Sequence, residues 1–184
     1  MPRVPGYAAF LRGVNLGKVR RVGSGELREI FEGEGFSEVS TYRTSGNVVF
    51  AADAQPQKDL VSRIERRLGD ELGYEVAVFL RTAKQVRAIA EHEPFPHKEA
   101  AASRGKLQVA MLSSAPSRQA RNEVLALATD KDRLAFGDLE VYWLPRGGTR
   151  DSTMNASTIE KILGPTTMRT KGTVELLAAK YFGG

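Results

Sequence analysis

Two short polar segments contain the residue types best suited to hold an anionic ligand. The first, LRGVNLGK at residues 11–18, has an arginine, an asparagine, a lysine and two glycines; the second, RTSGN at residues 43–47, adds another arginine, two hydroxyls, a glycine and an amide. Such side chains donate hydrogen bonds to phosphate or carboxylate oxygens, and glycine lets backbone N–H groups approach a ligand closely. The candidate ligand-binding residues of these segments are Arg12, Gly13, Asn15, Gly17, Lys18, Arg43, Ser45, Gly46 and Asn47.

The hydrophobic pattern predicts the elements that would carry these segments. Over the first 80 residues it gives the order strand, helix, strand, strand, helix, strand, which is the split βαβ order of a ferredoxin-like unit. Ser24 is expected to cap the first helix, and Gly73 is expected to end the second. The two middle strands, at 37–42 and 47–52, form a hairpin around the RTSGN turn.

The same order is expected to recur in the second half. Thr82 and Gln85 form a capping box for a third helix, and residues 91–105 follow as a connector interrupted by prolines. A strand at 106–112, a helix, a hairpin around Gly137 and another helix repeat the first half before a last helix. The sequence thus predicts an α+β fold of two tandem ferredoxin-like halves, whose antiparallel or mixed sheets are covered by helices. The expected bounds of the halves are residues 1–100 and 101–184.

Ferredoxin-like topology would bring the two polar segments together. The right-handed crossover places the third strand between the first two and antiparallel to both, so the end of the first strand and the turn after the second share one rim of the sheet. An alternative stays open, because Ser, Gly and Asn are ordinary turn formers. Arg12 interrupts an apolar strand and therefore needs either a ligand or an acidic partner within the protein.

Composition narrows the environment and the partners. The 184 residues include 27 Lys and Arg against 22 Asp and Glu, and the net charge of +5 favours anionic partners. With no cysteine, the chain has no disulfide, thiolate nucleophile or thiolate-bound metal, which agrees with the cytoplasm as its compartment. The N-terminal apolar run is broken by Arg12, so we expect neither a secretory signal nor a membrane span, and a mature chain numbered from about Met1.

A phosphate-binding motif is only partly present. GVNLGKV is one residue short of a P-loop and has Val19 where the loop needs a metal-binding hydroxyl. Lys18, Arg20 and Arg21 nevertheless come just before a predicted helix, whose N-terminal N–H groups and dipole favour anions. The alternative is a solvated basic loop.

Neither the aromatic residues nor the histidines define a site. Phe10 and Phe50 invite comparison with the stacking pair of an RNA-recognition motif, but the first strand is apolar on both faces, which favours a covered core. His92 and His97 lie in the connector without a metal-binding spacing, so no metal site is predicted. Ser45 has no identifiable base, so no catalytic residue is assigned and the cofactor stays unassigned.

Two further polar runs lie near the C-terminus, GTRDSTMNAST at residues 148–158 and TTMRTKGT at residues 166–173. Either would be able to line a cleft between the halves, and Arg169 is therefore added to the candidate ligand-binding residues. The alternatives are a helix N-cap region for the first run and a basic helix entry for the second.

Three segments, YAAFLRGVNLG, LREIFEGEGFSEVSTYRTSGNVVF and TTMRTKGTVELL, together resemble a bacterial family known as domain of unknown function 1697. The resemblance extends over nearly the whole chain and implies two ferredoxin-like halves, but it implies no activity, cofactor or catalytic residue. Many relatives look like TxRNWNT near the end, whereas this chain has Thr170, Lys171 and Gly172 between the matching Arg169 and Thr173. The missing aromatic implies an altered specificity or a lost function, if that aromatic contacts a ligand in relatives.

These features support a leading hypothesis and three alternatives. We expect a cytoplasmic protein that binds a small anionic ligand, such as a nucleotide or phosphometabolite, at the rim formed by residues 12–18 and 43–47. The first alternative is a nucleic-acid-binding module that uses a basic face and shows a steep salt dependence. The others are an enzyme in which Arg12 or Arg169 stabilises an oxyanion or phosphoryl group, and a protein-interaction scaffold without catalysis. No membrane partner is expected, and the sequence assigns no oligomeric state.

Overall fold

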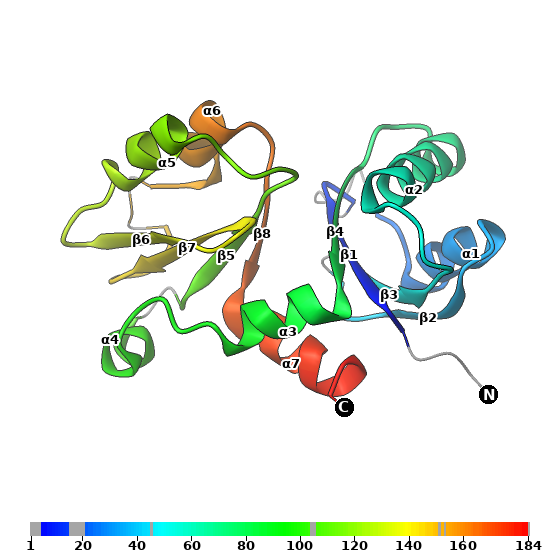
Figure 1. Cartoon of the computed structure of the whole chain (residues 1–184), viewed down its shortest axis with the longest axis horizontal. Coiled ribbons are helices and arrows are strands. Elements are labelled where there is room, and N and C mark those ends of the chain that lie inside the picture. The colour runs from blue at the N-terminus through cyan, green and yellow to red at the C-terminus, as the bar shows by residue number, and fades with distance from the viewer. Residues whose placement is uncertain are drawn as a thin grey trace. The chain divides into compact units, whose positions relative to one another are not determined.

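The computed structural model describes residues 5–14, 21–44, 46–103, 106–150, 152 and 154–183. The chain divides into two compact units (Figure 1). The first unit comprises Met1–Arg87 and Leu177–Gly184, and the second comprises Ala88–Leu176. Each unit contains one four-stranded sheet in which all neighbouring strands are antiparallel, so the predicted α+β fold with two halves is confirmed.

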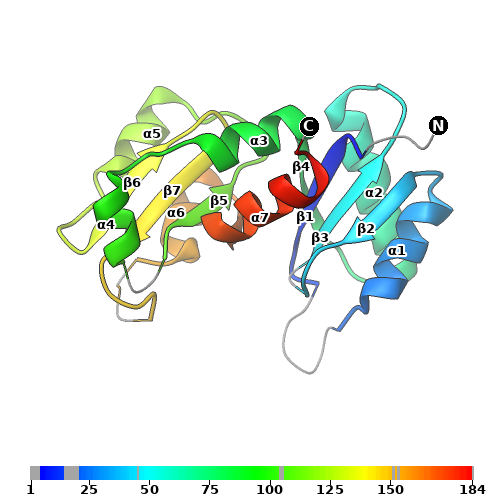
Figure 2. The same cartoon turned by 90° about the horizontal axis from the view of Figure 1, so that it is seen from below.

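The first unit follows the predicted element order. Its elements are β1 (Tyr7–Arg12), α1 (Ser24–Gly33), β2 (Ser37–Thr41), β3 (Asn47–Ala51), α2 (Gln57–Leu72) and β4 (Ala77–Thr82). The strand order is β2-β3-β1-β4, which places the third strand between the first two as ferredoxin-like topology requires (Figure 2).

Helices α1 and α2 cover one face of this sheet (Figure 1). The helices repeat apolar residues at three- and four-residue spacing, so that Leu27 of α1 and Leu60 of α2 join the core beneath them. Phe10 pairs with Asn47 whereas Tyr7 pairs with Phe50, so the side chains of Phe10 and Phe50 lie on opposite faces. Both phenylalanines are fully buried, which confirms their predicted place in the core.

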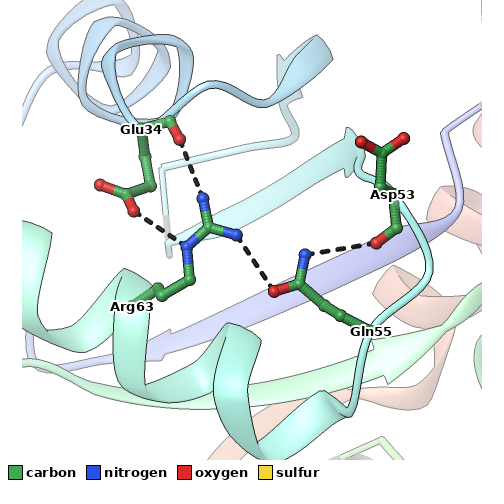
Figure 3. A network of polar contacts seen from close by, with 4 residues as sticks. All are labelled: Glu34, Asp53, Gln55 and Arg63. Atoms are coloured by element: carbon green, nitrogen blue, oxygen red, sulfur yellow. Dashed lines mark hydrogen bonds and ion pairs between the residues drawn. The ribbon is translucent and has the colours of Figure 1, made fainter.

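Arg63 connects α2 to the end of α1 and to the segment after β3 (Figure 3). Its Nε donates to Glu34 Oε1 at 3.0 Å, its Nη2 donates to the Glu34 carbonyl oxygen at 3.1 Å, and its Nη1 donates to Gln55 Oε1 at 3.1 Å. Gln55 Nε2 then donates to the Asp53 carbonyl oxygen at 3.3 Å. This arginine is thus a structural residue of the helical layer.

The second unit repeats the architecture. Its elements are β5 (Gln108–Met111), α5 (Arg118–Leu125), β6 (Asp132–Phe136), β7 (Glu140–Pro145), α6 (Ala156–Leu163) and β8 (Thr167–Thr170). The strand order β6-β7-β5-β8 matches that of the first unit, strand for strand (Figure 1). Helices α5 and α6 cover one face, with Val124 and Ile159 buried against Trp143.

Three further helices accompany the two sheets: α3 (Ala83–Glu91), α4 (His97–Ala102) and α7 (Lys171–Tyr181). The predicted capping box of α3 is confirmed, because Thr82 N–H donates to Gln85 Oε1 at 2.8 Å and Gln85 N–H donates to Thr82 Oγ1 at 3.2 Å. Throughout the described residues, no helix combines the length and the apolar character needed to cross a membrane.

Three sequence-based expectations for individual elements were wrong. Gly23, rather than Ser24, is the N-cap residue of α1, and it makes no side-chain capping bond. The connector at 91–105 contains helix α4, because its HKEAAA segment consists largely of strong helix formers. No strand was expected before the last helix, whereas Thr167–Thr170 forms β8, which pairs with β5 along four residues and leads directly into α7.

Candidate functional site

The end of β1 and the turn between β2 and β3 meet at one rim of the first sheet, as the topology predicts. Leu11 N–H donates to the Gly46 carbonyl oxygen at 2.8 Å, and Phe10 is the register partner of Asn47. Gly46 has a φ of 78°, and a Cβ at this position would lie 2.6 Å from Val14 Cγ2 and 3.1 Å from Leu11 Cβ. The rim therefore requires glycine here, both for backbone conformation and for space.

Asn47 holds the hairpin from inside. Its side chain is 1% exposed, and its Nδ2 donates to the Tyr42 carbonyl oxygen at 2.9 Å. The backbone closes the same turn, because Tyr42 N–H donates to the Asn47 carbonyl oxygen at 2.9 Å. These contacts make Asn47 a residue that shapes the turn.

The second unit has the same rim without the polar sequence, and it therefore serves as an internal comparison. Leu112 N–H donates to the Leu139 carbonyl oxygen at 2.9 Å, as Leu11 does to Gly46. Gly137 N–H donates to the Glu140 carbonyl oxygen at 2.9 Å, which closes the turn with fewer residues than 43–46 provide. The contacts common to both rims belong to the fold, whereas Arg43 and its neighbours are additions of the first unit.

A pocket of about 460 Å³ opens at the first rim, between the N-terminus of α1 and the β2–β3 turn. We call it the rim pocket. Arg21 and Arg43 are its two basic lining residues, and its described lining contains no carboxylate. The remaining walls combine hydroxyls, backbone and two apolar side chains. The lining residues are Arg21, Val22, Gly23, Ser24, Leu27, Thr41, Arg43, Thr44 and Gly46.

The N-terminus of α1 contributes donors to this pocket. Gly23 has no side chain to cap the helix, so the first-turn N–H groups of α1 have no side-chain acceptor at the N-cap. In the second unit, Ser117 fills this role for α5, with its Oγ accepting from Ala120 N–H at 3.1 Å. The first helix is thus left ready for an external anion, which its dipole and N–H groups would stabilise.

In the second unit, an arginine takes the place of Leu27, one of the residues that line the rim pocket. Counting from the first residue of each helix, Leu27 of α1 corresponds to Arg121 of α5. Arg121 Nη2 donates to the Gly137 carbonyl oxygen at 3.0 Å, and its guanidinium carbon lies 5.0 Å from the ring centre of Phe136. The second unit thus has the guanidinium group of Arg121 at this place, whereas the first unit has the open rim pocket.

Arg43 is held in an unusual conformation beside the pocket. Its φ is 60°, in the left-handed region, which costs an ordinary residue on the order of 1 kcal/mol. Its guanidinium carbon lies 5.4 Å above the ring centre of Tyr42. Arg43 is exposed and is one of the residues that line the pocket.

Arg43 and Gly46 are the predicted site residues that line the rim pocket. Arg12 is half-buried at the end of β1, pairs with Ala77, and projects from the face of the sheet that carries Phe10, opposite the face covered by α1. Gly13 and Asn47 belong to the rim but do not line the pocket. Asn15, Gly17, Lys18 and Ser45 lie outside the described residues.

Sequence reasoning missed most of the lining. Arg21 carried a signal, since it is the last basic residue before α1, but it was not among the candidate residues. Thr41 and Leu27 read as ordinary strand and helix positions, and only the packing of α1 against the hairpin brings them to one surface.

Arg169 belongs to the second unit, where it is 8% exposed. Its Nη1 donates to Thr167 Oγ1 at 2.8 Å and to the Met168 carbonyl oxygen at 2.9 Å. Burial lowers the pKa of Arg169 to about 10, which still leaves it a cation at neutral pH. The adjacent family departure is structural as well, because the hydroxyls of Thr170 and Thr173 lie 2.8 Å apart.

The histidines take part in no described metal site. The His92 ring centre lies 4.9 Å from that of Tyr142, and His97 is the first residue of α4. The residues that the structure describes contain no group of three or more His, Cys, Asp or Glu side chains able to hold a metal ion.

The fold and the rim together define a double ferredoxin-like protein with a basic pocket in its first unit. The chain belongs to the family described as "Protein of unknown function (DUF1697)", which it matches over residues 4–142. The rim pocket lies within the matched residues, whereas Arg169 and the departure at 170–172 lie beyond them. The suspected family is therefore confirmed.

A solved structure has the same fold. The conserved bacterial protein SP0830 from Streptococcus pneumoniae is 19% identical, with a TM-score of 0.73, and the match covers 98% of this chain and 99% of that chain. At this identity the likeness shows the fold alone. No curated protein matches the chain.

Proposed function

We propose that this is a cytoplasmic protein that binds a small anionic ligand, a nucleotide or a phosphorylated metabolite, at the rim pocket. One observation carries the proposal: two arginines and an uncapped helix N-terminus border a single hollow whose described lining has no carboxylate. Its volume of about 460 Å³ suits a small molecule. The absence of cysteine agrees with a reducing compartment.

The groups that line the pocket contribute differently to binding. Arg21 and Arg43 neutralise the charge of the ligand and donate to its oxygens, and the first N–H groups of α1 donate along the helix axis. The hydroxyls of Thr41 and Thr44 add neutral hydrogen bonds, while Leu27 offers an apolar contact. The described lining has no imidazole or carboxylate to act as a general base, which favours binding over acid–base catalysis.

The internal comparison supports a ligand role over a purely structural one. The fold itself needs neither an open hollow nor a left-handed arginine at this rim, because the second unit closes the corresponding place with Ser117 and Arg121. Strain of the kind seen at Arg43 is retained where the surrounding structure or a function requires it.

Thermal shift and calorimetry test the proposal. The wild type and the variants Arg21→Ala and Arg43→Ala are titrated with inorganic pyrophosphate, sugar phosphates and nucleotides at two salt concentrations. A ligand at about 100 times its dissociation constant should stabilise the protein by roughly 2.7 kcal/mol, and each variant should lose at least about tenfold in affinity.

Arg66→Ala is the matched control, since it removes an equal charge from an exposed position of α2 outside the pocket. It should bind like the wild type. Equal losses in Arg66→Ala and Arg43→Ala would mean that general charge, and not the pocket, attracts the anion. Absence of binding by every anion would overturn the proposal.

A basic face in the second unit supports nucleic-acid binding as a second candidate. A pocket of about 740 Å³ between α4 and the β6–β7 hairpin is bordered by Lys98, Lys131, Arg133 and Arg146, against Glu99 and Asp130. Arg133 forms an ion pair with Glu99. Oligonucleotide binding by this face would weaken steeply with salt and would fall in Lys131→Ala and Arg146→Ala, whereas rim-pocket variants would leave it unchanged.

A further inference from the structure

Two hollows in the second unit meet at one pair of basic residues. The first is the pocket of about 740 Å³ beside α4, and the second is a pocket of about 360 Å³ bordered by Gly147, Gly148 and Ser152. We call them the α4 hollow and the loop hollow. Lys131 and Arg146 line both hollows, and we call these two residues the shared pair.

The shared pair lies at the end of the β6–β7 ladder. Arg146 N–H donates to the Lys131 carbonyl oxygen at 2.7 Å, one residue beyond the register pair of Asp132 and Pro145. Both residues of the shared pair are exposed, and within the described part of the chain neither side chain forms an ion pair. Like charges on directly opposed residues repel each other, so this arrangement costs stability unless an anion lies between them.

The two hollows open on opposite faces of this ladder. The α4 hollow is lined by Arg133 and Leu144, which are register partners, and the loop hollow is lined by the adjacent register pair, Asp132 and Pro145. Successive residues of a strand point to opposite faces of the sheet. A ligand that occupies both hollows must therefore turn sharply at the shared pair.

The carboxylates of Glu99 and Asp132 are already engaged within the protein. Glu99 forms an ion pair with Arg133. Asp132 is 3% exposed, and its carboxylate accepts from Trp143 Nε1 and from Ser152 Oγ, each at 2.7 Å. These two carboxylates therefore oppose a bound anion only weakly.

The rest of the lining favours a chain of phosphates. Asp130 is the one further carboxylate of the described lining, and it stands against Lys98 and the shared pair. Arginine and lysine bind phosphate oxygens through charge-assisted hydrogen bonds. The described lining of both hollows contains no aromatic ring on which a base would stack, so recognition here depends on phosphate rather than on base sequence.

We propose that a single strand of nucleic acid binds across the second unit, with one phosphate at the shared pair and the neighbouring phosphates in the α4 hollow and the loop hollow. This inference rests on the second candidate function, adds the loop hollow to its site, and is independent of the rim pocket. A single strand bends at each phosphodiester, whereas duplex DNA stays nearly straight over a persistence length of about 50 nm. The sharp turn at the shared pair therefore selects the single strand.

Fluorescence anisotropy with labelled oligonucleotides tests the inference. Single strands of about 12 nucleotides, made of thymidine, adenosine or cytidine, and a duplex of the same length are titrated at several salt concentrations. Phosphate contacts by Lys98, Lys131 and Arg146 predict a slope of about −2 in log K against log salt concentration. The three single strands should bind alike, and each should bind at least about tenfold more tightly than the duplex.

Variants of the shared pair identify the site. Lys131→Ala and Arg146→Ala should each weaken binding and bring the salt slope closer to zero by about 0.7. Arg118→Ala is the matched control, because it removes an equal charge from an exposed position of α5 outside both hollows, and it should leave affinity and slope unchanged. An equal loss in Arg118→Ala would assign the binding to general charge and overturn the inference.

Gly148→Asp and Gly148→Asn test the loop hollow. The two new side chains have the same shape, so any strain is common to both variants and only the charge differs. Gly148→Asp should bind the single strand at least about fivefold more weakly than Gly148→Asn. Equal affinities would place the strand outside the loop hollow and overturn the inference. The melting temperature of each variant verifies that it is folded.

The outcomes separate the inference from the candidate function on which it rests. If duplex and single strands bind alike and Lys131→Ala weakens both, nucleic-acid binding stands and the bent single strand is overturned. A poly-glutamate peptide of equal charge that binds as tightly as the single strand also overturns the inference, because an acidic polypeptide then fits the site as well. If no oligonucleotide binds, the second candidate function and the inference fail together, while the proposal for the rim pocket is unaffected.

Discussion

Arg81 and Arg169 occupy equivalent positions in the two units, and each donates from Nη1 to the carbonyl oxygen of the residue before it at 2.9 Å. Arg81 is the register partner of Ala8 in β1, and Arg169 is the register partner of Val109 in β5. Both arginines are buried on the fourth strand of their sheet, and one threonine separates each from the helix that follows.

The threonines that follow extend this equivalence. Gln85 N–H donates to Thr82 Oγ1 at the start of α3, and Thr173 N–H donates to Thr170 Oγ1 at the start of α7, both at 3.2 Å. The repeat of Arg-Thr and a cap at the same structural place indicates that the second unit is a duplicate of the first. This residue-level repeat is too short to stand out in the sequence.

Replacing the buried arginine of the first unit should be costly. Arg81 is 2% exposed, and Arg81→Met leaves the Leu80 carbonyl oxygen without this donor, so the free energy of unfolding should fall by about 1–3 kcal/mol. Urea denaturation gives the value, and Arg66→Met, at an exposed position of α2, should change it by less than about 0.5 kcal/mol. Equal stability of Arg81→Met and the wild type would contradict a structural role.

The second unit should become more stable at alkaline pH because of Arg169. Burial lowers its pKa from 12.5 to about 10, so above pH 10 the unfolded chain binds more protons than the folded protein, and stability from this group rises with pH. Below pH 10 the full cost of burying the cation is present. Between pH 9 and 10.5, the wild type should gain up to about 1 kcal/mol relative to Arg169→Gln.

Denaturation curves of the wild type and of Arg169→Gln at four pH values give the difference between their free energies of unfolding. The lysines and tyrosines are common to both proteins, so their titration cancels in this difference. A wild type that loses stability relative to Arg169→Gln over that pH range would show that the pKa of Arg169 is raised, through an ion pair stronger than the effect of burial.

The caps of α3 and α7 should contribute similarly to stability. Thr82→Ala and Thr170→Ala each remove the side-chain acceptor of a first-turn N–H group, and each should cost about 1 kcal/mol of unfolding free energy. Thr82→Ser and Thr170→Ser keep the acceptor and should retain most of the stability. An alanine variant as stable as its serine counterpart would mean that water replaces the cap.

Two glycines near the pocket should respond oppositely to alanine. Gly46→Ala places a Cβ 2.6 Å from Val14 Cγ2 at a φ of 78° and should cost at least about 2 kcal/mol. Gly25→Ala, within α1 and with nothing within 4 Å of its Cβ, should stabilise the protein by about 0.5–1 kcal/mol. Thermal unfolding of both variants should show shifts of opposite sign, and a tolerated Gly46→Ala would show that the rim rearranges freely.

Gly23 offers a way to separate stability from binding. Its φ of −69° and ψ of 153° suit any residue, and nothing lies within 4 Å of its Cβ. Gly23→Asp should cap α1 and stabilise the free protein by a few tenths of a kcal/mol, roughly, while its carboxylate weakens anion binding at least about tenfold.

Gly23→Asn is the matched control, because it adds a cap of the same shape without charge and should weaken binding much less. Unchanged anion affinity in Gly23→Asp would place the ligand away from the N-terminus of α1.

Much of the fold follows from local chemistry. The spacing of apolar residues in α1 and α2, the Thr82–Gln85 capping box and the left-handed Gly73 after α2 are each specified by a few neighbouring residues, and all were predicted. The meeting of the two polar segments at one rim was predicted from the handedness of the strand–helix–strand crossover, because a right-handed crossover leaves one place for the third strand. The short strand β8 could not be predicted, because its polar TMRT sequence becomes a strand only by pairing with the edge of β5.

By itself, the sequence determined the order of the elements, the two-unit α+β class and the two segments that meet at the rim. Only the tertiary structure decided which cations line a pocket there. Arg12 looked the stronger candidate, but the alternation of side chains along β1 places it on the face away from α1, whereas Arg43, in the turn after β2, lines the pocket. Whether a side chain is a ligand group or a core contact depends on the face it occupies, and strand pairing and helix packing set that face over distances the local sequence does not encode.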